Sequence, residues 1–159
     1  MDKPPIILSL PAYVVEYALV NSSVSFVDTR TLNVGGEWLG AVPKLAICRN
    51  VKTLEYHLSH CNDDWEELCS VQSGETVEDV RAIAEKHYVG INGKWNPTGY
   101  SEAEANAAIE EIKDGMRCSF CGKSAYDDAG IKRLVEGSNA NICDICVKDF
   151  ASSMDDEPS

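Results

Sequence analysis

The chain has 159 residues, with 14 Lys and Arg against 26 Asp and Glu, so its formal net charge is −12. An excess of acid argues against binding to nucleic acid or to an anionic membrane, since both need a basic surface. Hydrophobic residues make up 44% of the chain, which fits one ordinary core with a small additional module.

The first 42 residues carry the weakest local signals. A short apolar run after Met1 is interrupted by Pro11, so we expect no signal peptide. No apolar stretch approaches the roughly 20 residues that span a bilayer, and we expect a cytoplasmic protein. Residues 12–20 are rich in β-branched and aromatic side chains, which favours a strand, although Pro11 would also suit the first turn of a helix. Residues 24–27 alternate like a second strand, and residues 35–40 are expected to form a loop.

Residues 43–72 are predicted to form an antiparallel meander of three strands, over 44–51, 53–61 and 65–71. The connections are short and polar, as in hairpins. In the middle strand, alternation places His60 on one face and both His57 and Cys61 on the other. Because these three residues point to two faces, we do not expect them to form a metal site.

The acidic cluster Asp63, Asp64, Trp65, Glu66 and Glu67 lies at the turn before the third of these strands. In one interpretation the loop is solvated and Trp65 anchors the core. In the other the cluster is a partner-binding surface, because Trp is favoured at interfaces and flanking carboxylates attract a basic partner.

Two helices follow the meander. Thr76 and Asp79 form a variant capping box for a helix over 76–88, which is expected to pack on the sheet. Residues 89–95 are predicted to be extended and to end before Pro97. Residues 1–98 are thus interpreted as an α+β domain, and residues 99–115 as a connecting helix that begins with the capping box Ser101-x-x-Glu104.

Two C-x-x-C pairs dominate the C-terminal part of the chain. Cys118 and Cys121 form the first pair, and Cys143 and Cys146 form the second, 21 residues further on. Two such turns that face each other provide four thiolates in a tetrahedron, which suits one structural zinc ion. The module is assigned to residues 116–150, followed by a disordered acidic tail over 151–159.

The other three cysteines are Cys48, Cys61 and Cys69. Their spacing does not suggest disulfides, so they are expected to be free thiols in a reducing compartment. A nucleophile built from Cys61 or Cys69 with a histidine would require a Cys/His-dependent enzyme, but no local signature supports one.

Residues around the ligands resemble a known family. The segments Cys118-Ser119-Phe120-Cys121-Gly122-Lys123 and Asn141-Ile142-Cys143-Asp144-Ile145-Cys146 are similar to the zinc-binding domain of the ClpX unfoldase. The resemblance implies a small zinc-nucleated fold that dimerises and holds adaptors or substrates. In this chain the module lies C-terminal to the α+β residues, we expect no ATPase to follow it, and Tyr126 to Gly130 lengthen the spacer.

Together these features predict a non-enzymatic zinc protein that binds another protein. The most specific hypothesis is a bacterial immunity or antitoxin protein that masks a basic toxin. One alternative is a proteolysis adaptor that uses the zinc module for dimerisation or delivery, and another is a small Cys/His-dependent enzyme.

Overall fold

The structure is a computed structural model that describes residues 2–126 and 130–155. The chain divides into two compact units, Met1–Ala108 and Ile109–Ser159. The boundary falls inside α2 (Glu102–Gly115), the helix that the sequence predicts as a connector. Each unit is therefore described by itself. Among the described residues, no helix combines the length and the apolar character that crossing a membrane requires.

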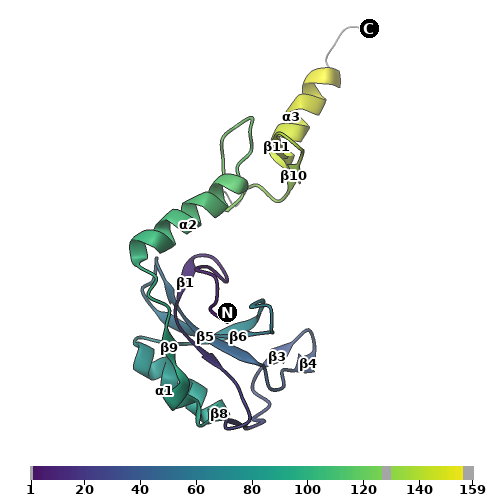
Figure 1. Ribbon diagram of the computed structural model, residues 1–159. Coiled ribbons are helices and arrows are strands. Elements are labelled where there is room, and N and C mark those ends of the chain that lie inside the picture. Colours follow the sequence, from purple (N-terminus) through teal and green to yellow (C-terminus); the bar gives the residue numbers. More distant parts are fainter. Residues whose placement is uncertain (1, 127–129, 156–159) are drawn as a thin grey trace. The chain divides into compact units, whose positions relative to one another are not determined.

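The first unit is built on a five-stranded antiparallel sheet, which confirms the α+β class (Figure 1). The strand order is β7-β6-β5-β1-β9, and the predicted meander forms its β5-β6-β7 half. The strand expected over 12–20 is the fourth in this order. The bounds of the strands are β1 Ala12–Leu19, β5 Lys44–Asn50, β6 Tyr56–Cys61, β7 Glu67–Gly74 and β9 Asn96–Pro97.

The two faces of the sheet carry separate hydrophobic clusters. On one face Ile47 and Leu58 pack against Val80 and Ala84 of α1 (Val77–His87). On the other face lies a second cluster: Ala12, Val14, Ala46, Cys48, Cys61 and Trp65. The alternation predicted along β6 is confirmed, because Leu58 and Cys61 belong to different clusters.

Helix α1 begins as its capping box predicts. The Thr76 hydroxyl accepts a hydrogen bond from the Asp79 backbone N–H, and the Asp79 carboxylate accepts one from the Thr76 N–H, both at 3.1 Å. These contacts satisfy two N–H groups that the helix cannot pair internally. The apolar stripe at Val80 and Ala84 is thereby directed toward the sheet.

Several short elements complete this unit and correct two predictions. Residues 89–95 are not one extended segment, because a 3-10 helix, η1 (Ile91–Lys94), follows β8 (Tyr88–Val89). Gly90 turns the chain with φ 98°, and the Glu85 carboxylate accepts hydrogen bonds from the N–H groups of Gly90 and Asn92. The predicted loop over 35–40 contains part of a hairpin. β2 (Ser25–Phe26) pairs with β8, and β3 (Asn33–Val34) pairs with β4 (Glu37–Trp38).

The second unit contains the end of α2, a small hairpin and a final helix. β10 (Leu134–Glu136) pairs with β11 (Asn141–Cys143), and α3 (Asp144–Asp155) begins directly after Cys143. The tail prediction is wrong over 151–155, which continue α3. The rest of the predicted tail, 156–159, lies outside the described residues, as do residues 127–129 of the predicted spacer insertion.

Candidate metal centre

The two C-x-x-C pairs meet in the second unit, as their spacing predicts. The first pair lies in the turn after α2, and the second spans the junction between β11 and α3. Candidate ligand atoms of all four cysteines lie within 4.8 Å of one another. The Sγ atoms of Cys118 and Cys146 are 3.7 Å apart, and those of Cys121 and Cys143 are 3.9 Å apart.

These distances fit a zinc ion. A tetrahedron with Zn–S bonds of about 2.3 Å has sulfur–sulfur edges of about 3.8 Å. Four sulfur ligands fill every position of a tetrahedral zinc ion, so the site is of the closed, structural kind. The four cysteines are therefore positioned to bind one zinc ion.

Backbone N–H groups direct hydrogen bonds at the sulfurs. The N–H of Cys143 donates to Cys118 Sγ at 3.4 Å, and the N–H of Cys146 donates to Cys143 Sγ at 3.5 Å. Burial acts to raise the pKa of Cys118, but backbone N–H donors outweigh it and lower that pKa to about 6. Burial and the neighbouring sulfurs raise the pKa of Cys146 to about 12. Four charged sulfurs this close together need a cation, and a bound Zn²⁺ would provide the compensating charge.

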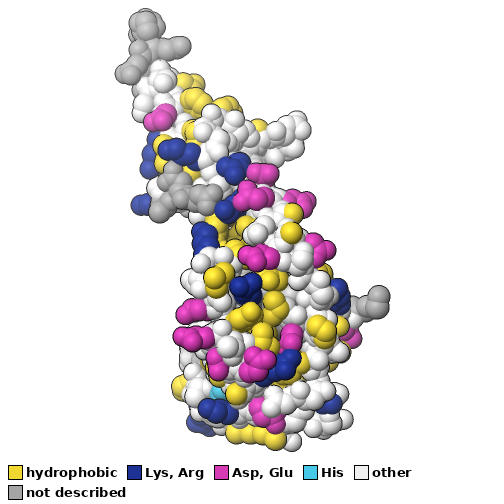
Figure 2. All heavy atoms as spheres, turned by 90° about the vertical axis from the view of Figure 1, so that its left-hand side faces the viewer, with side chains coloured by type: hydrophobic (Ala, Val, Ile, Leu, Met, Phe, Trp, Pro, Cys, Tyr) yellow, Lys and Arg dark blue, Asp and Glu magenta, His cyan; other side chains and the backbone are white. Residues whose placement is uncertain are grey.

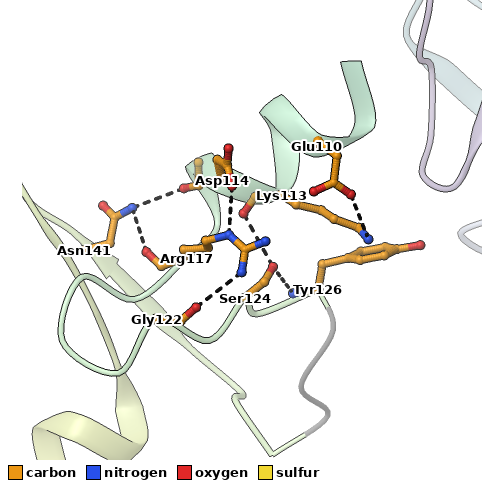
Figure 3. Close-up of polar contacts among 9 residues, drawn as sticks. Glu110, Lys113, Asp114, Arg117, Gly122, Ser124, Tyr126 and Asn141 are labelled. Carbon is orange, nitrogen blue, oxygen red and sulfur yellow. Dashed lines mark hydrogen bonds and ion pairs between the residues drawn. The ribbon is translucent and has the colours of Figure 1, made fainter. Parts of the chain in front are cut away.

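The first metal-binding turn is held to the end of α2 by polar contacts (Figure 3). Arg117 donates to the Asp114 carboxylate at 2.8 Å and to the carbonyl of Gly122 at 3.3 Å. The Asn141 side chain donates to the carbonyls of Gly115 and Arg117. Residues 114–122 and the start of β11 are thus fixed together independently of the ligands themselves.

Few apolar side chains are buried around this centre. Among the described residues of the second unit, the buried cluster consists of Ile131 and three of the cysteines, with Ala125, Leu134 and Ile142 packed against it. A module with so little buried apolar area depends on its metal for folding.

Comparison with known families agrees with this geometry. Residues 116–156 match the family described as ClpX C4-type zinc finger. This segment is therefore similar to the ClpX-type zinc fingers. The match covers about a quarter of the chain and includes all four ligands, which confirms the resemblance seen in the sequence. Neither curated proteins nor solved structures gave a match to the chain.

The residues of the acidic cluster before β7 differ in burial. Trp65 is only 9% exposed; its ring packs edge-on against Tyr17, with centroids 5.8 Å apart, and Lys44 Nζ lies 5.0 Å from its centre. Glu67 accepts a hydrogen bond from the buried Ser59 hydroxyl. Both side chains are therefore turned into the unit. The carboxylates that remain exposed are Asp63, Asp64 and Glu66, and their role in binding stays a prediction.

The other cysteines and histidines form no second metal group in the described part of the chain. Cys48 and Cys61 are buried, and burial raises the pKa of each thiol to about 12. A nucleophilic cysteine needs the opposite shift, so the enzyme hypothesis loses support at Cys61.

A partly buried chain of polar contacts that the sequence did not predict lies between the sheet and α1. His60 Nε2 is 3.3 Å from the Gln72 amide oxygen, and the Gln72 amide nitrogen is 2.8 Å from His87 Nε2. His87 Nδ1 in turn lies 3.2 Å from the Thr29 hydroxyl. These residues come from four separate segments, so no local sequence pattern indicates their contact. His60 Nδ1 is buried and has no partner among the described residues.

Proposed function

We propose that this chain is a non-enzymatic protein-interaction protein in which zinc holds a partner-binding surface in place. The observation that carries the proposal is an exposed apolar surface on the zinc finger. A closed four-sulfur site leaves no position for a substrate or water on the metal, so the metal acts through the surface that it folds.

This apolar surface consists of Phe120, Val147, Phe150 and Met154. Phe120, Phe150 and Met154 are 58%, 47% and 75% exposed, and the two phenyl rings pack edge-on with centroids 5.3 Å apart. Val147, Phe150 and Met154 follow one another at helical spacing on α3, so they share one face. Exposed apolar residues that gather in this way are typical of interaction sites; Figure 2 shows hydrophobic side chains at the surface of the C-terminal part.

The charge of the α+β unit suggests the partner. Residues 1–108 hold 8 Lys and Arg against 15 Asp and Glu, and acidic side chains are spread over the face in Figure 2. Such a field attracts a basic protein and speeds its association. The specific form of the proposal is an immunity or antitoxin protein that masks a basic toxin in the cytoplasm of a bacterium.

A proteolysis adaptor is the second candidate, and the ClpX-type finger is the observation that favours it. In that case the apolar surface on α3 would pair two copies of the chain or dock on the proteolytic machinery. Sedimentation velocity separates these uses, because Phe150→Asp would convert a dimer to a monomer if the surface joins two copies.

The test is affinity capture with the zinc-loaded chain as bait, followed by kinetics with the purified partner. Three baits are compared: the native chain, Phe150→Asp, and Asp63→Lys with Asp64→Lys. A masked toxin predicts a basic partner whose association slows as salt rises from 50 to 300 mM, because screening shortens the range of the attraction. It also predicts that one equivalent of the chain abolishes the partner's toxic activity.

The outcomes discriminate between the candidates. A basic partner that is lost with the double reversal supports the masking protein. A protease or unfoldase subunit that is lost only with Phe150→Asp supports the adaptor. An acidic partner whose binding does not respond to salt or to the reversals would contradict the electrostatic proposal.

A further inference from the structure

The two edges of the five-stranded sheet differ in how well they are protected from pairing with another chain. One edge is β9, a strand of two residues that includes Pro97. Short strands and proline are devices that keep an edge from pairing with another chain. The other edge is β7, which is eight residues long and contains neither proline nor lysine, although its pairing with β6 has two register shifts.

The outer side of β7 is open to pairing. β7 pairs with β6 on one side, and it ends the strand order on the other. In the described part of the chain, no backbone group outside the sheet bonds to β7. Residues 68–74 are uncharged, so no side-chain charge along this edge repels an incoming strand.

Acidic residues lie at both ends of this uncharged edge. Residues 53–80, here called the acidic run, contain eight Asp and Glu and no Lys or Arg. Asp63, Asp64 and Glu66 are exposed before β7, and Glu75 and Glu78 are exposed after it. An approaching strand therefore meets negative charge at each end and none in the middle.

We propose that β7 binds an extended segment of another protein as an additional strand, and that this segment is uncharged in its centre and basic at both ends. Main-chain hydrogen bonds to the open edge would supply affinity, and the flanking carboxylates would select the charge. The inference rests on the proposed function, because it places the contact with the basic partner at one edge of the α+β unit.

A second copy of this chain fits the same edge poorly. Antiparallel pairing of β7 with itself around Val71 would place Glu67 opposite Glu75 of the other copy at both ends. Like charges directly opposite each other destabilise a pair of strands. The charge pattern thus favours a basic segment over self-association.

The test uses the full zinc-loaded chain and a synthetic peptide with a Val-Thr-Val-Thr-Val centre and a Lys-Arg pair at each end. Binding is followed by NMR of the ¹⁵N-labelled chain, with hydrogen exchange at the β7 amides. The expected result is a shift confined to β7 and its flanks, with new protection at alternate β7 amides, because alternate residues of a strand face outward. N-methylation of alternate peptide amides should abolish binding, and replacing the basic residues by Glu should do the same.

Matched variants locate the site. Leu68→Lys and Ser73→Lys each add a positive charge on β7, which repels the basic peptide. Each should weaken binding about fivefold, because an exposed charge contact changes a binding constant by about that factor. Val34→Lys makes the same charge change in the β3–β4 hairpin and should change binding less than about twofold. Circular dichroism confirms that each variant keeps its fold.

Absence of any shift at β7 at millimolar peptide would overturn the inference, and so would equal binding of the basic and acidic peptides. If sedimentation shows a dimer and Ser73→Lys dissociates it, the strand that occupies the β7 edge is a second copy of this chain and not a basic partner. A natural basic partner that still binds Leu68→Lys and Ser73→Lys at full affinity would refute the β7 site and leave the proposed function standing. Failure of the proposed function would give a different result: the partner would be acidic, or its binding would not depend on salt.

Discussion

Removing one zinc ligand should unfold the zinc finger and leave the sheet intact. Binding of structural zinc contributes about 10–16 kcal/mol at neutral pH. Ile131, the one buried apolar side chain besides the cysteines in the described part of the finger, contributes about 1.5–3 kcal/mol. The metal therefore outweighs the apolar core several times, and Cys143→Ser should remove both the metal and the fold of the second unit.

Elemental analysis and a ¹⁵N NMR spectrum measure the two parts of this prediction. Zinc should fall from about one ion per chain to almost none, and resonances of residues 116–155 should collapse to random-coil positions. Resonances of the sheet should stay in place, since Cys143 lies in the other unit and distant sites act independently. Cys69→Ser, at a half-buried thiol outside the site, is the control and should keep its zinc. A Cys143→Ser variant that retains zinc or a folded finger would refute the reasoning.

Three further predictions concern the α+β unit. Leu58→Ala should lower the free energy of unfolding by about 2–5 kcal/mol in urea titrations, because the side chain is fully buried against α1. Burial lowers the pKa of His60 and of His87 below the usual value of 6.5. The unfolded chain therefore binds protons more readily than the folded chain. The stability that these residues contribute should be complete above about pH 6.5 and should fall as the pH drops below it. Thermal melts from pH 7.5 to 5 should show this fall, and His60→Gln should reduce it. Cys48 and Cys61, with pKa values of about 12, should resist iodoacetamide in the native chain and react after unfolding, as mass spectrometry would show.

Local signals in the sequence predicted the elements that depend on neighbouring residues. The capping boxes at Thr76 and Ser101 are both formed, because each needs only residues three positions apart. The alternation along β6 placed His60 and Cys61 on opposite faces, where the structure has them. The four zinc ligands were predictable for a similar reason, since each C-x-x-C turn is local and the metal chemistry implies the second pair.

Features that depend on distant contacts were not predictable. The segment at 89–95 curls into η1 because Glu85 reaches across from α1 to cap it. The interpretation in which Trp65 anchors the core is confirmed, but the contacts with Tyr17 and Lys44 that bury it leave no mark on its acidic neighbours. The hairpin at 33–38 is an exception. The adjacent Gly35 and Gly36 indicate a tight two-residue turn in the sequence, and both have positive φ in the structure.

The order of the two units along the chain has a consequence for metal loading in the cell. Synthesis proceeds at about 5–20 residues per second, and N-terminal domains fold first. Roughly 40 residues separate the end of the first unit from the last ligand, Cys146. The sheet therefore has about 2–8 s to fold before the zinc site is complete. Cys48, Cys61 and His60, which could capture zinc wrongly, are buried in that sheet. A sheet that folds within this time would have closed off these three side chains before the fourth ligand leaves the ribosome.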